Sequence, residues 1–385
     1  MPSRPALRPR ILDSLREVPS AQWDALVDDL PTKPTPFLKH AFLSALEDNG
    51  CVGPKTGWTP RFVTLWESDR LVAAMPLYLK DHSYGEYVFD WAWARAYHEH
   101  GVDYYPKLLC AVPFTPVRGP RLLAPTTELR AALLQAAIQL TGETSSSSLH
   151  ILFPPDEILP ELDQAQMMTR SNVQFHWHNT GFTNFDDFLA TMNHDKRKKI
   201  KQERRRVRDA GLHFVWRTGG EASEAEWDFF SRCYHHTYRA HGFSPYLNRR
   251  FFGQLAAAMP QHLLLIVALL DGQPVASALN IIDADTLYGR YWGSVGFLSG
   301  LHFETCYYQA IEFCIAHRLQ RFEGGAQGEH KLARGLLPVR MHSAHWIAHP
   351  GFSRAIAQYL RQEDGGITHY VDELNEHSPF KAHAL

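Results

Sequence analysis

The sequence has few cysteines and no long hydrophobic segment. None of its apolar runs reaches the roughly 18 residues that a membrane-spanning helix requires, so we expect no membrane span. The five cysteines among 385 residues are scattered and form no CxxC pair, which indicates buried, reduced thiols in a cytoplasmic protein. Residues 1–15 are basic but lack the apolar centre of a secretory signal, so a frayed tail is the simpler interpretation.

Several catalytic signatures are also missing. The GxSxG nucleophile turn, the GxGxxG dinucleotide loop and the HExxH zinc motif do not occur. Because 22 histidines is a high number, a metal site has to be considered. The possible ligands are His302, Glu304, Glu329, His330, His342 and His345. The last two are three residues apart on an expected strand and would point to opposite faces. No known ligand spacing is present, and we expect no metal site.

The length and composition indicate a globular protein of two domains. A chain of 385 residues is too long for one hydrophobic core. With 45% apolar, 12% aromatic and 21% charged residues, the composition is ordinary for a folded protein. The order of expected elements places the boundary near residue 180, which gives an N-terminal domain of residues 1–180 and a C-terminal domain of residues 181–385.

The net charge of −2 hides one strongly basic element. Residues 196–208 contain nine Lys or Arg and one Glu, which leaves 30 basic and 40 acidic residues, a charge of −10, in the rest of the chain. This expected helix is either a solvated surface or a phosphate-binding surface for tRNA or the nucleotide of coenzyme A. Its first turn matters most, because helix N-termini direct free N–H groups at anions. The run lacks aromatic residues, so base stacking is not indicated, and we expect no DNA partner. The candidate phosphate ligands are Lys196, Arg197, Lys199 and Arg204.

The two halves of the chain repeat a pattern of helices, a three-stranded meander, a helix and a further strand. The expected meanders run through residues 61–91 and 263–294, and in each the last strand carries a Tyr-Gly-x-Tyr sequence, at residues 84–87 and 288–291. The offset of about 204 residues predicts two copies of one α/β domain. The first copy has no counterpart of the basic helix, and none of the segment RFEGGAQGEHKLARG at residues 321–335.

This segment, residues 321–335, is the strongest candidate for an active site. It contains four glycines, two carboxylates, a histidine and three cations directly after an expected strand. Glycine-rich loops with many ionisable groups, placed after a strand, are where α/β proteins carry out chemistry. Lys331 is the expected cation for an oxyanion, an acceptor carboxylate or a phosphate, with an ordinary surface lysine as the alternative.

The neighbours of Lys331 supply candidates for proton transfer. His330 and Glu329 could remove a proton from an attacking amine, but adjacent residues of an extended segment point in opposite directions, so only one should face the cleft. Glu323 would orient Lys331 or the amine, or would cap a turn. Residues expected to bind substrate are Arg290 and Trp292, on the strand face opposite Tyr291, together with His302, Glu304 and Arg334. A carboxylate at a helix N-terminus, as Glu304 is, also has a purely structural explanation.

Three stretches of the sequence together resemble one known family. The family's basic helix resembles residues 194–211, HDKRKKIKQERRRVRDAG. The strand, loop and helix that line its donor pocket resemble residues 289–304, GRYWGSVGFLSGLHFE. Its acidic-glycine segment, which is followed by Phe-Lys, resembles residues 321–331, RFEGGAQGEHK. Glu323-Gly324-Gly325 takes the acidic-glycine position and Lys331 the lysine, with His330 in place of Phe. The whole chain resembles the GNAT acyltransferase fold in tandem, as in Fem-type aminoacyl transferases, and most of all the Fem-like peptidoglycan biosynthesis/recognition branch.

The resemblance implies an α/β (α+β) fold of two tandem GNAT-like acyl-CoA N-acyltransferase domains, each a mixed sheet flanked by helices. It implies transfer of an acyl or aminoacyl group from acyl-CoA or aminoacyl-tRNA to the amine of a small-molecule or peptide-like acceptor, with no tightly bound cofactor and with tRNA as a possible partner. Residues 296–300 lack the usual GNAT Q/RxxGxG/A pattern, which leaves aminoacyl-tRNA open as the donor. The alternative is a non-catalytic protein of this fold that binds cell-wall fragments or RNA.

Overall fold

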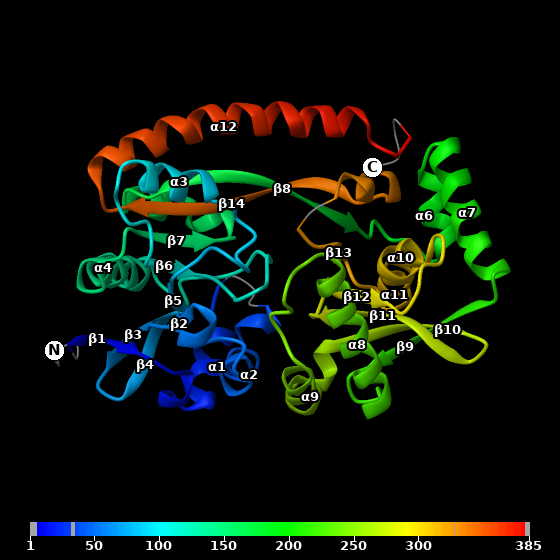
Figure 1. The fold of residues 1–385 in the computed structure, drawn as a ribbon, viewed down its shortest axis with the longest axis horizontal. Coiled ribbons are helices and arrows are strands. Elements are labelled where there is room, and N and C mark those ends of the chain that lie inside the picture. Colours follow the sequence, from blue (N-terminus) through cyan, green and yellow to red (C-terminus); the bar gives the residue numbers. More distant parts are fainter. Residues whose placement is uncertain (1–5, 32–34, 327, 382–385) are drawn as a thin grey trace. The chain divides into compact units, whose positions relative to one another are not determined.

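The computed structural model describes residues 6–31, 35–326 and 328–381, which form two compact units (Figure 1). The first unit comprises residues 1–172 and 341–368, and the second comprises residues 173–340 and 369–385. This division differs from the expected boundary at residue 180, because the C-terminal part of the chain is shared between the units. Strands β8 (Met168–His178) and β14 (Leu337–Ile347) and helix α12 (Pro350–Glu376) each contribute residues to both units. Helix α12 is a single helix of 27 residues.

The first unit contains two sheets. The smaller has the order β1-β3-β4, and strands β2, β5, β6, β7 and β14 follow one another in the other. Residues 7–12, expected as a frayed tail, form β1 and pair with β3. Residues 1–5 lie outside the described part of the chain. The elements of the first unit are β1 (Leu7–Leu12), α1 (Ser20–Asp28), α2 (His40–Asp48), β2 (Trp58–Pro60), β3 (Phe62–Glu67), β4 (Arg70–Met75), β5 (Leu77–Lys80), α3 (Trp91–Glu99), β6 (Lys107–Cys110), α4 (Thr127–Glu143), β7 (Ser148–Leu152) and α5 (Leu159–Gln164).

One expected strand of the first unit is wrong. Residues 84–90 form a loop, and α3 begins at Trp91. The Tyr-Gly-x-Tyr repeat therefore does not mark equivalent strands, because residues 288–291 do lie on a strand. The loop is held by an ion cluster and not by pairing with a neighbouring strand. Its carboxylates Glu86 and Asp90 point inward and bind the buried ammonium of Lys107.

The second unit is built on one mixed sheet with the strand order β8-β13-β12-β11-β10-β9. The antiparallel β10–β11–β12 meander was predicted from its continuous apolar runs and the Asp271-Gly272 turn. Its elements are α6 (Phe185–Thr191), α7 (His194–Asp209), β9 (Leu212–Thr218), α8 (Glu224–Ala240), α9 (Arg249–Ala258), β10 (Leu263–Leu270), β11 (Gln273–Ile282), β12 (Thr286–Ser294), α10 (Leu301–Phe303), the π-helical turn η6 (Glu304–Tyr308), α11 (Gln309–Ala316), β13 (Arg321–Glu323) and the 3-10 helix η7 (Glu329–Arg334).

Helices cover both faces of the β11–β12 pair. Helix α8 packs on one face and η6 with α11 on the other. Adjacent residues of β12 show this division, since the ring of Tyr291 lies 5.1 Å from that of Tyr234 on α8, and the ring of Trp292 lies 4.7 Å from that of His302. The buried core on the η6–α11 side includes Trp177, Phe188, Ala278, Ile311 and Phe322.

Two irregularities of β12 open space within this sheet. The register with β11 shifts between Leu279, which is opposite Tyr291, and Asn280, which is opposite Gly289, so Arg290 is the extra residue of a β-bulge. On its other side, β12 pairs in parallel with β13 at only three positions, residues 286–288. Bulges and short parallel pairs of this kind re-aim side chains and interrupt the sheet, and bulges are frequent beside active sites.

Candidate active site in the second unit

A cavity of about 130 Å³ lies where β12 and β13 separate. Its walls come from β11, β12, η6 and the turn Gly324-Gly325 that follows β13. The turn requires glycine, since Gly325 has a φ of +86° and a Cβ on Gly324 would lie 2.6 Å from the side chain of Leu336. The wide π-helical turn of η6 faces the same space, and such turns are frequent at functional sites.

Lys331 lies directly against this glycine turn. Its side chain is buried, with 3% exposure, and its Nζ donates a hydrogen bond to the carbonyl oxygen of Gly325 at 2.9 Å. Burial lowers the pKa of Lys331 to about 8. An ammonium has three donors, and among the described residues only Gly325 accepts from this one. The site therefore holds a buried cation whose hydrogen bonds are incomplete.

The two candidate bases beside Lys331 contact different residues. His330 Nε2 lies 3.0 Å from the hydroxyl of Tyr307, a residue that lines the cavity. Glu329 is exposed and accepts a hydrogen bond from the hydroxyl of Tyr370 on α12 at 2.6 Å. Burial, reinforced by the cations Lys331 and Arg334, lowers the pKa of His330, so its imidazole is neutral at pH 7. His330, and not Glu329, is thus placed with the cavity residues.

An aromatic and imidazole cluster forms the side of the cavity next to His330. The ring of His302 is tilted against that of Trp292, with the centroids 4.7 Å apart, and its centroid lies 6.2 Å from that of His330. Burial, with contributions from His330 and from the cations Arg334 and Lys331, lowers the pKa of His302 to about 4. Trp292 and His302 both line the cavity and present neutral rings to it, and their role in substrate binding remains a prediction.

Arg290 and Glu323 lie differently from their expected positions. The bulge turns the Arg290 guanidinium over the ring of Tyr291, at 5.2 Å, so Arg290 does not share a face with Trp292. It still borders the cavity. The buried carboxylate of Glu323 lies 3.8 Å from His176 Nε2 and 3.7 Å from Arg321 Nε, along β8 and β13. Its contacts suit a residue that holds the end of β13.

Three other candidate residues form an ion network that fastens the basic helix to the site. Arg204 of α7 binds the buried carboxylate of Glu304 at 2.9 Å. Glu203 of α7 binds the buried guanidinium of Arg334 at 3.1 Å and accepts a hydrogen bond from the hydroxyl of Tyr308. These pairs neutralise one another, so a structural role accounts for Arg204, Glu304 and Arg334. They also bring α7, η6 and η7 together within one unit.

The remaining cations of α7 divide into paired and unpaired groups. Lys201 binds Asp186, and Arg205 binds Asp209. Among the described residues, no carboxylate pairs with the four consecutive cations at the start of the helix, which are Lys196, Arg197, Lys198 and Lys199. The Asn193 side chain caps this end by accepting from the backbone N–H of Lys196 at 3.0 Å.

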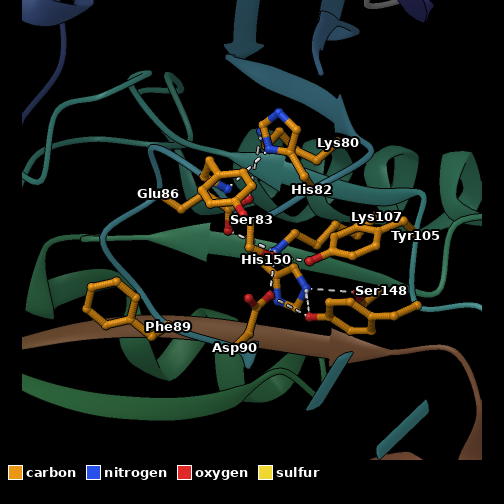
Figure 2. A network of polar contacts seen from close by, with 12 residues as sticks. Lys80, His82, Ser83, Glu86, Phe89, Asp90, Tyr105, Lys107, Ser148 and His150 are labelled. Atoms are coloured by element: carbon orange, nitrogen blue, oxygen red, sulfur yellow. Dashed lines mark hydrogen bonds and ion pairs between the residues drawn. The ribbon is translucent and has the colours of Figure 1, made fainter. Parts of the chain in front are cut away.

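A second buried lysine, in the first unit, provides an internal comparison (Figure 2). Lys107 is fully buried, and its ammonium donates to Ser83 at 2.7 Å, to Glu86 at 2.8 Å and to Asp90. Although burial alone lowers it, these carboxylates raise the pKa of Lys107. All three donors and the charge are satisfied, which is typical of a structural ion cluster. The ammonium of Lys331, by contrast, has one acceptor and no carboxylate partner among the described residues, and its pKa is lowered and not raised. This difference distinguishes the structural lysine, Lys107, from the candidate functional lysine, Lys331.

Several cavity residues were not found from the sequence, and Tyr307 and Asn280 are among them. Tyr307 and Asn280 carry no motif, and only the packing of η6 on the bulged strand pair places them at the cavity. Among residues 6–31, 35–326 and 328–381, no cluster of three or more His, Cys, Asp or Glu side chains could hold a metal ion, and no helix is long and apolar enough to cross a membrane. All five cysteines are free thiols.

Comparison with known proteins places the chain in a family. The model of the FemAB-like family, described as peptidoglycan biosynthesis/recognition, matches residues 14–382. The solved structure of FemX has a TM-score of 0.55 at 12% identity and covers 88% of this chain and 98% of its own. That of L-PGS from Bacillus licheniformis has a TM-score of 0.52 at 10% identity, covering 89% and 97%. No curated protein matches the sequence. The two structures show a shared mixed α/β fold, and the family match confirms the predicted resemblance to the Fem-like branch: the chain belongs to the FemAB-like family.

Proposed function

We propose that the protein is an N-acyltransferase that joins an activated acyl or aminoacyl group to the amine of a small-molecule or peptide-like acceptor at the cavity of the second unit. Membership of the FemAB-like family supports this reaction class. The observation that carries the proposal is the buried ammonium of Lys331 beside a cavity, which has one acceptor and no carboxylate partner among the residues that the structure describes. Such a group suits negative charge that forms only during the reaction.

The residues around the cavity can be given roles in the transfer. The acceptor nitrogen forms a bond to the carbonyl carbon of the donor, and the carbonyl oxygen becomes an oxyanion whose charge Lys331 stabilises. The neutral imidazole of His330 takes the proton that the amine loses, while Tyr307 holds the ring at 3.0 Å. The oxyanion then collapses, the bond to the donor sulfur or oxygen breaks, and the leaving group takes the proton from His330. Glu329 has no part in this reaction, because its carboxylate accepts a hydrogen bond from the hydroxyl of Tyr370.

The start of α7 is proposed as the surface that binds phosphates of the donor, whether coenzyme A or tRNA. Its cations Lys196, Arg197, Lys198 and Lys199 have no carboxylate partner in the described part of the chain, whereas Arg204 is neutralised by Glu304. Unpaired cations on one helical turn bind phosphates through charge and not through sequence. The same observation favours the second candidate function, a non-catalytic protein that binds RNA or another polyanion.

The first experiment asks which donor binds. Thermal unfolding is followed with coenzyme A, acetyl-CoA and bulk aminoacyl-tRNA, since a ligand of the native state raises the melting temperature. Donor consumption is then measured with a panel of primary amines. We expect Lys331→Met and His330→Gln to lower turnover by about 100-fold or more, with donor binding retained.

The matched control is Lys55→Met, a lysine that is exposed in the first unit and should turn over normally. Wild-type turnover by Lys331→Met would remove Lys331 from the mechanism. Stabilisation by a polyanion combined with no donor consumption for any amine would favour the binding protein instead.

A further inference from the structure

Strand β9 forms one edge of the sheet of the second unit, and in the described part of the chain it pairs with β10 alone. The N–H of Gly219, just after β9, donates to the carbonyl oxygen of Leu263, which lies opposite it in the same register. Hydrogen-bonded and non-hydrogen-bonded pairs alternate in an antiparallel ladder. Every second residue of β9, Phe214 and Trp216 among them, therefore directs its N–H and C=O groups away from β10.

The outward main-chain groups of Phe214 and Trp216 have no hydrogen-bond partner among the residues that the structure describes. Those of Thr218 are paired, because its N–H donates to Glu221 Oε2 at 2.9 Å and its carbonyl oxygen accepts from the N–H of Glu221. Phe214 and Trp216 are half-buried, so their main chain is not sealed in the core. Open N–H and C=O groups at a spacing of two residues are the template on which a further strand can pair.

A groove of about 1180 Å³ follows this edge, and six consecutive residues of β9, 212–217, line it. They include Trp216, whose Nε1 donates to Gln309 on α11 at 3.0 Å, and Arg217, which binds Glu226 on α8 at 3.1 Å. Residues from both faces of β9 thus border the groove, and helices α6 and α7 form its other wall. Small-molecule sites have roughly 300–1,000 Å³, so a groove of this size suits a segment of polypeptide.

The groove carries an excess of positive charge. Its lining has five cations, Lys201, Arg204, Arg205, Arg208 and Arg217, and three carboxylates, Asp186, Glu304 and Glu312. The three carboxylates bind Lys201 and Arg204. Arg208 is exposed and has no carboxylate partner within residues 6–31, 35–326 and 328–381, and the pair of Arg205 with Asp209 is exposed and therefore weak. The charge of the groove favours an acidic occupant.

We propose that the groove binds an extended acidic segment of a partner protein, which adds to the edge of β9 as a further strand. Hydrogen bonds to the main chain of Phe214 and Trp216 hold the segment, and its carboxylates face Arg205 and Arg208. A second copy of this chain fits less well, since pairing of β9 with itself brings two sets of cations together. This interaction is separate from the transfer reaction, because among the described residues none lines both the groove and the active-site cavity.

The probe is a fluorescein-labelled, C-terminally amidated heptapeptide, Thr-Glu-Val-Glu-Val-Glu-Thr, which matches the seven residues of β9 in length. Its binding to the full chain is measured by fluorescence anisotropy. A matched peptide with lysine in place of each glutamate should bind more weakly by about tenfold or more, because it places like charges in the groove.

Two N-methylated peptides distinguish strand addition from attraction by charge alone. One is methylated on the nitrogens of the three glutamates and the other on those of the two valines. Alternate residues of a strand direct their N–H groups to opposite edges. One version should therefore lose its hydrogen bonds to β9 and bind about tenfold or more weakly, while the other binds like the parent peptide. Equal binding by the two versions would overturn the proposal.

Hydrogen exchange of residues 212–218, followed by mass spectrometry with single-residue fragmentation, gives a second readout. The parent peptide should slow exchange of the Phe214 and Trp216 amides, whose N–H groups point away from β10. Unchanged exchange of both amides at a saturating concentration of the peptide would overturn strand addition.

Two charge reversals test the groove in the protein itself. Arg208→Glu should weaken binding of the acidic peptide by about tenfold and strengthen binding of the lysine peptide. Arg250→Glu is the matched control, an exposed arginine on α9 that does not line the groove, and it should bind both peptides as the wild type does. Both variants should keep the wild-type melting temperature, since both arginines are exposed.

Equal binding of the acidic peptide by Arg208→Glu and the wild type would overturn the proposal, as would no binding by the wild type. A dimer that the peptide does not dissociate would assign the edge of β9 to a second copy of the chain instead. Binding of single-stranded RNA that Arg208→Glu weakens, with no binding of the peptide, would assign the groove to nucleic acid. Each of these outcomes leaves the proposed transferase function standing.

Discussion

Replacing Lys331 by methionine should stabilise the protein, although it removes a buried group near the candidate site. Burial lowers the pKa of Lys331 from 10.5 to about 8, and 1 pKa unit corresponds to about 1.36 kcal/mol, so the folded state carries this charge at a cost of about 3 kcal/mol at pH 7. The hydrogen bond to Gly325, worth roughly 1.5 kcal/mol for a charged donor, is lost with the side chain. We therefore expect Lys331→Met to be more stable than the wild type by about 1–2 kcal/mol at neutral pH.

The pH dependence of the free energy of unfolding is an independent test of whether the buried charge of Lys331 destabilises the folded protein. Between about pH 8 and 10.5 the unfolded chain keeps the proton of Lys331 while the folded state has lost it. Because the unfolded state binds more protons in this window, this lysine makes wild-type stability rise with pH there. Below pH 8 both states are protonated and the full cost is present. Lys331→Met should lack this contribution, so its advantage should shrink as the pH approaches 10.5.

Urea unfolding at pH 7, 8, 9 and 10, followed by tryptophan fluorescence, measures both effects as differences between the wild type and the variant. Lys55→Met, an exposed lysine, is the control and should stay within about 0.5 kcal/mol at every pH. A Lys331→Met protein less stable than the wild type at pH 7, or a difference that does not change between pH 8 and 10, would refute the reasoning. The ammonium would then have further partners in the folded protein.

Three further sets of substitutions test the two ion networks and the proposed phosphate-binding surface of α7. Lys107→Met leaves the buried carboxylates of Glu86 and Asp90 without their cation and should lower the free energy of unfolding by about 3–5 kcal/mol, measured by urea titration; a loss under 1 kcal/mol would contradict a structural role. Arg204→Gln, which breaks the pair with buried Glu304, should cost roughly 2 kcal/mol, whereas Arg205→Gln, whose pair with Asp209 is exposed, should cost about 0.5 kcal/mol or less. Replacing Lys196, Lys198 and Lys199 together by Gln should reduce the slope of log affinity against log salt for tRNA by up to about 2–3, with Lys201→Gln as a paired-lysine control; an unchanged slope would place the phosphates elsewhere.

Local features of the chain were predictable where one pattern decided the structure. The β10–β11–β12 meander and the cationic surface of α7 depend on residues a few positions apart, and each was predicted from the sequence. The family resemblance extended this to the fold, because three separated motifs occurred in the family's order. Residues 321–335 were predicted as the candidate site because glycines and ionisable groups are concentrated there directly after a strand, and this remains a prediction.

The tertiary structure decided whatever depends on partners distant in the sequence. The loop at residues 84–90 is held by its contacts with Lys107 and does not pair with a neighbouring strand. Arg204 is neutralised by Glu304, a carboxylate 100 residues away in the sequence. Alternation along β12 predicted one face for Arg290 and Trp292, but a bulge against β11 turned Arg290 away. The unpaired Nδ2 of Asn280 and the incompletely hydrogen-bonded ammonium of Lys331 are properties of their surroundings and have no sequence signal. Spacing along the chain specifies which residues can share an element, whereas burial and hydrogen-bond satisfaction are set by groups that only folding brings together.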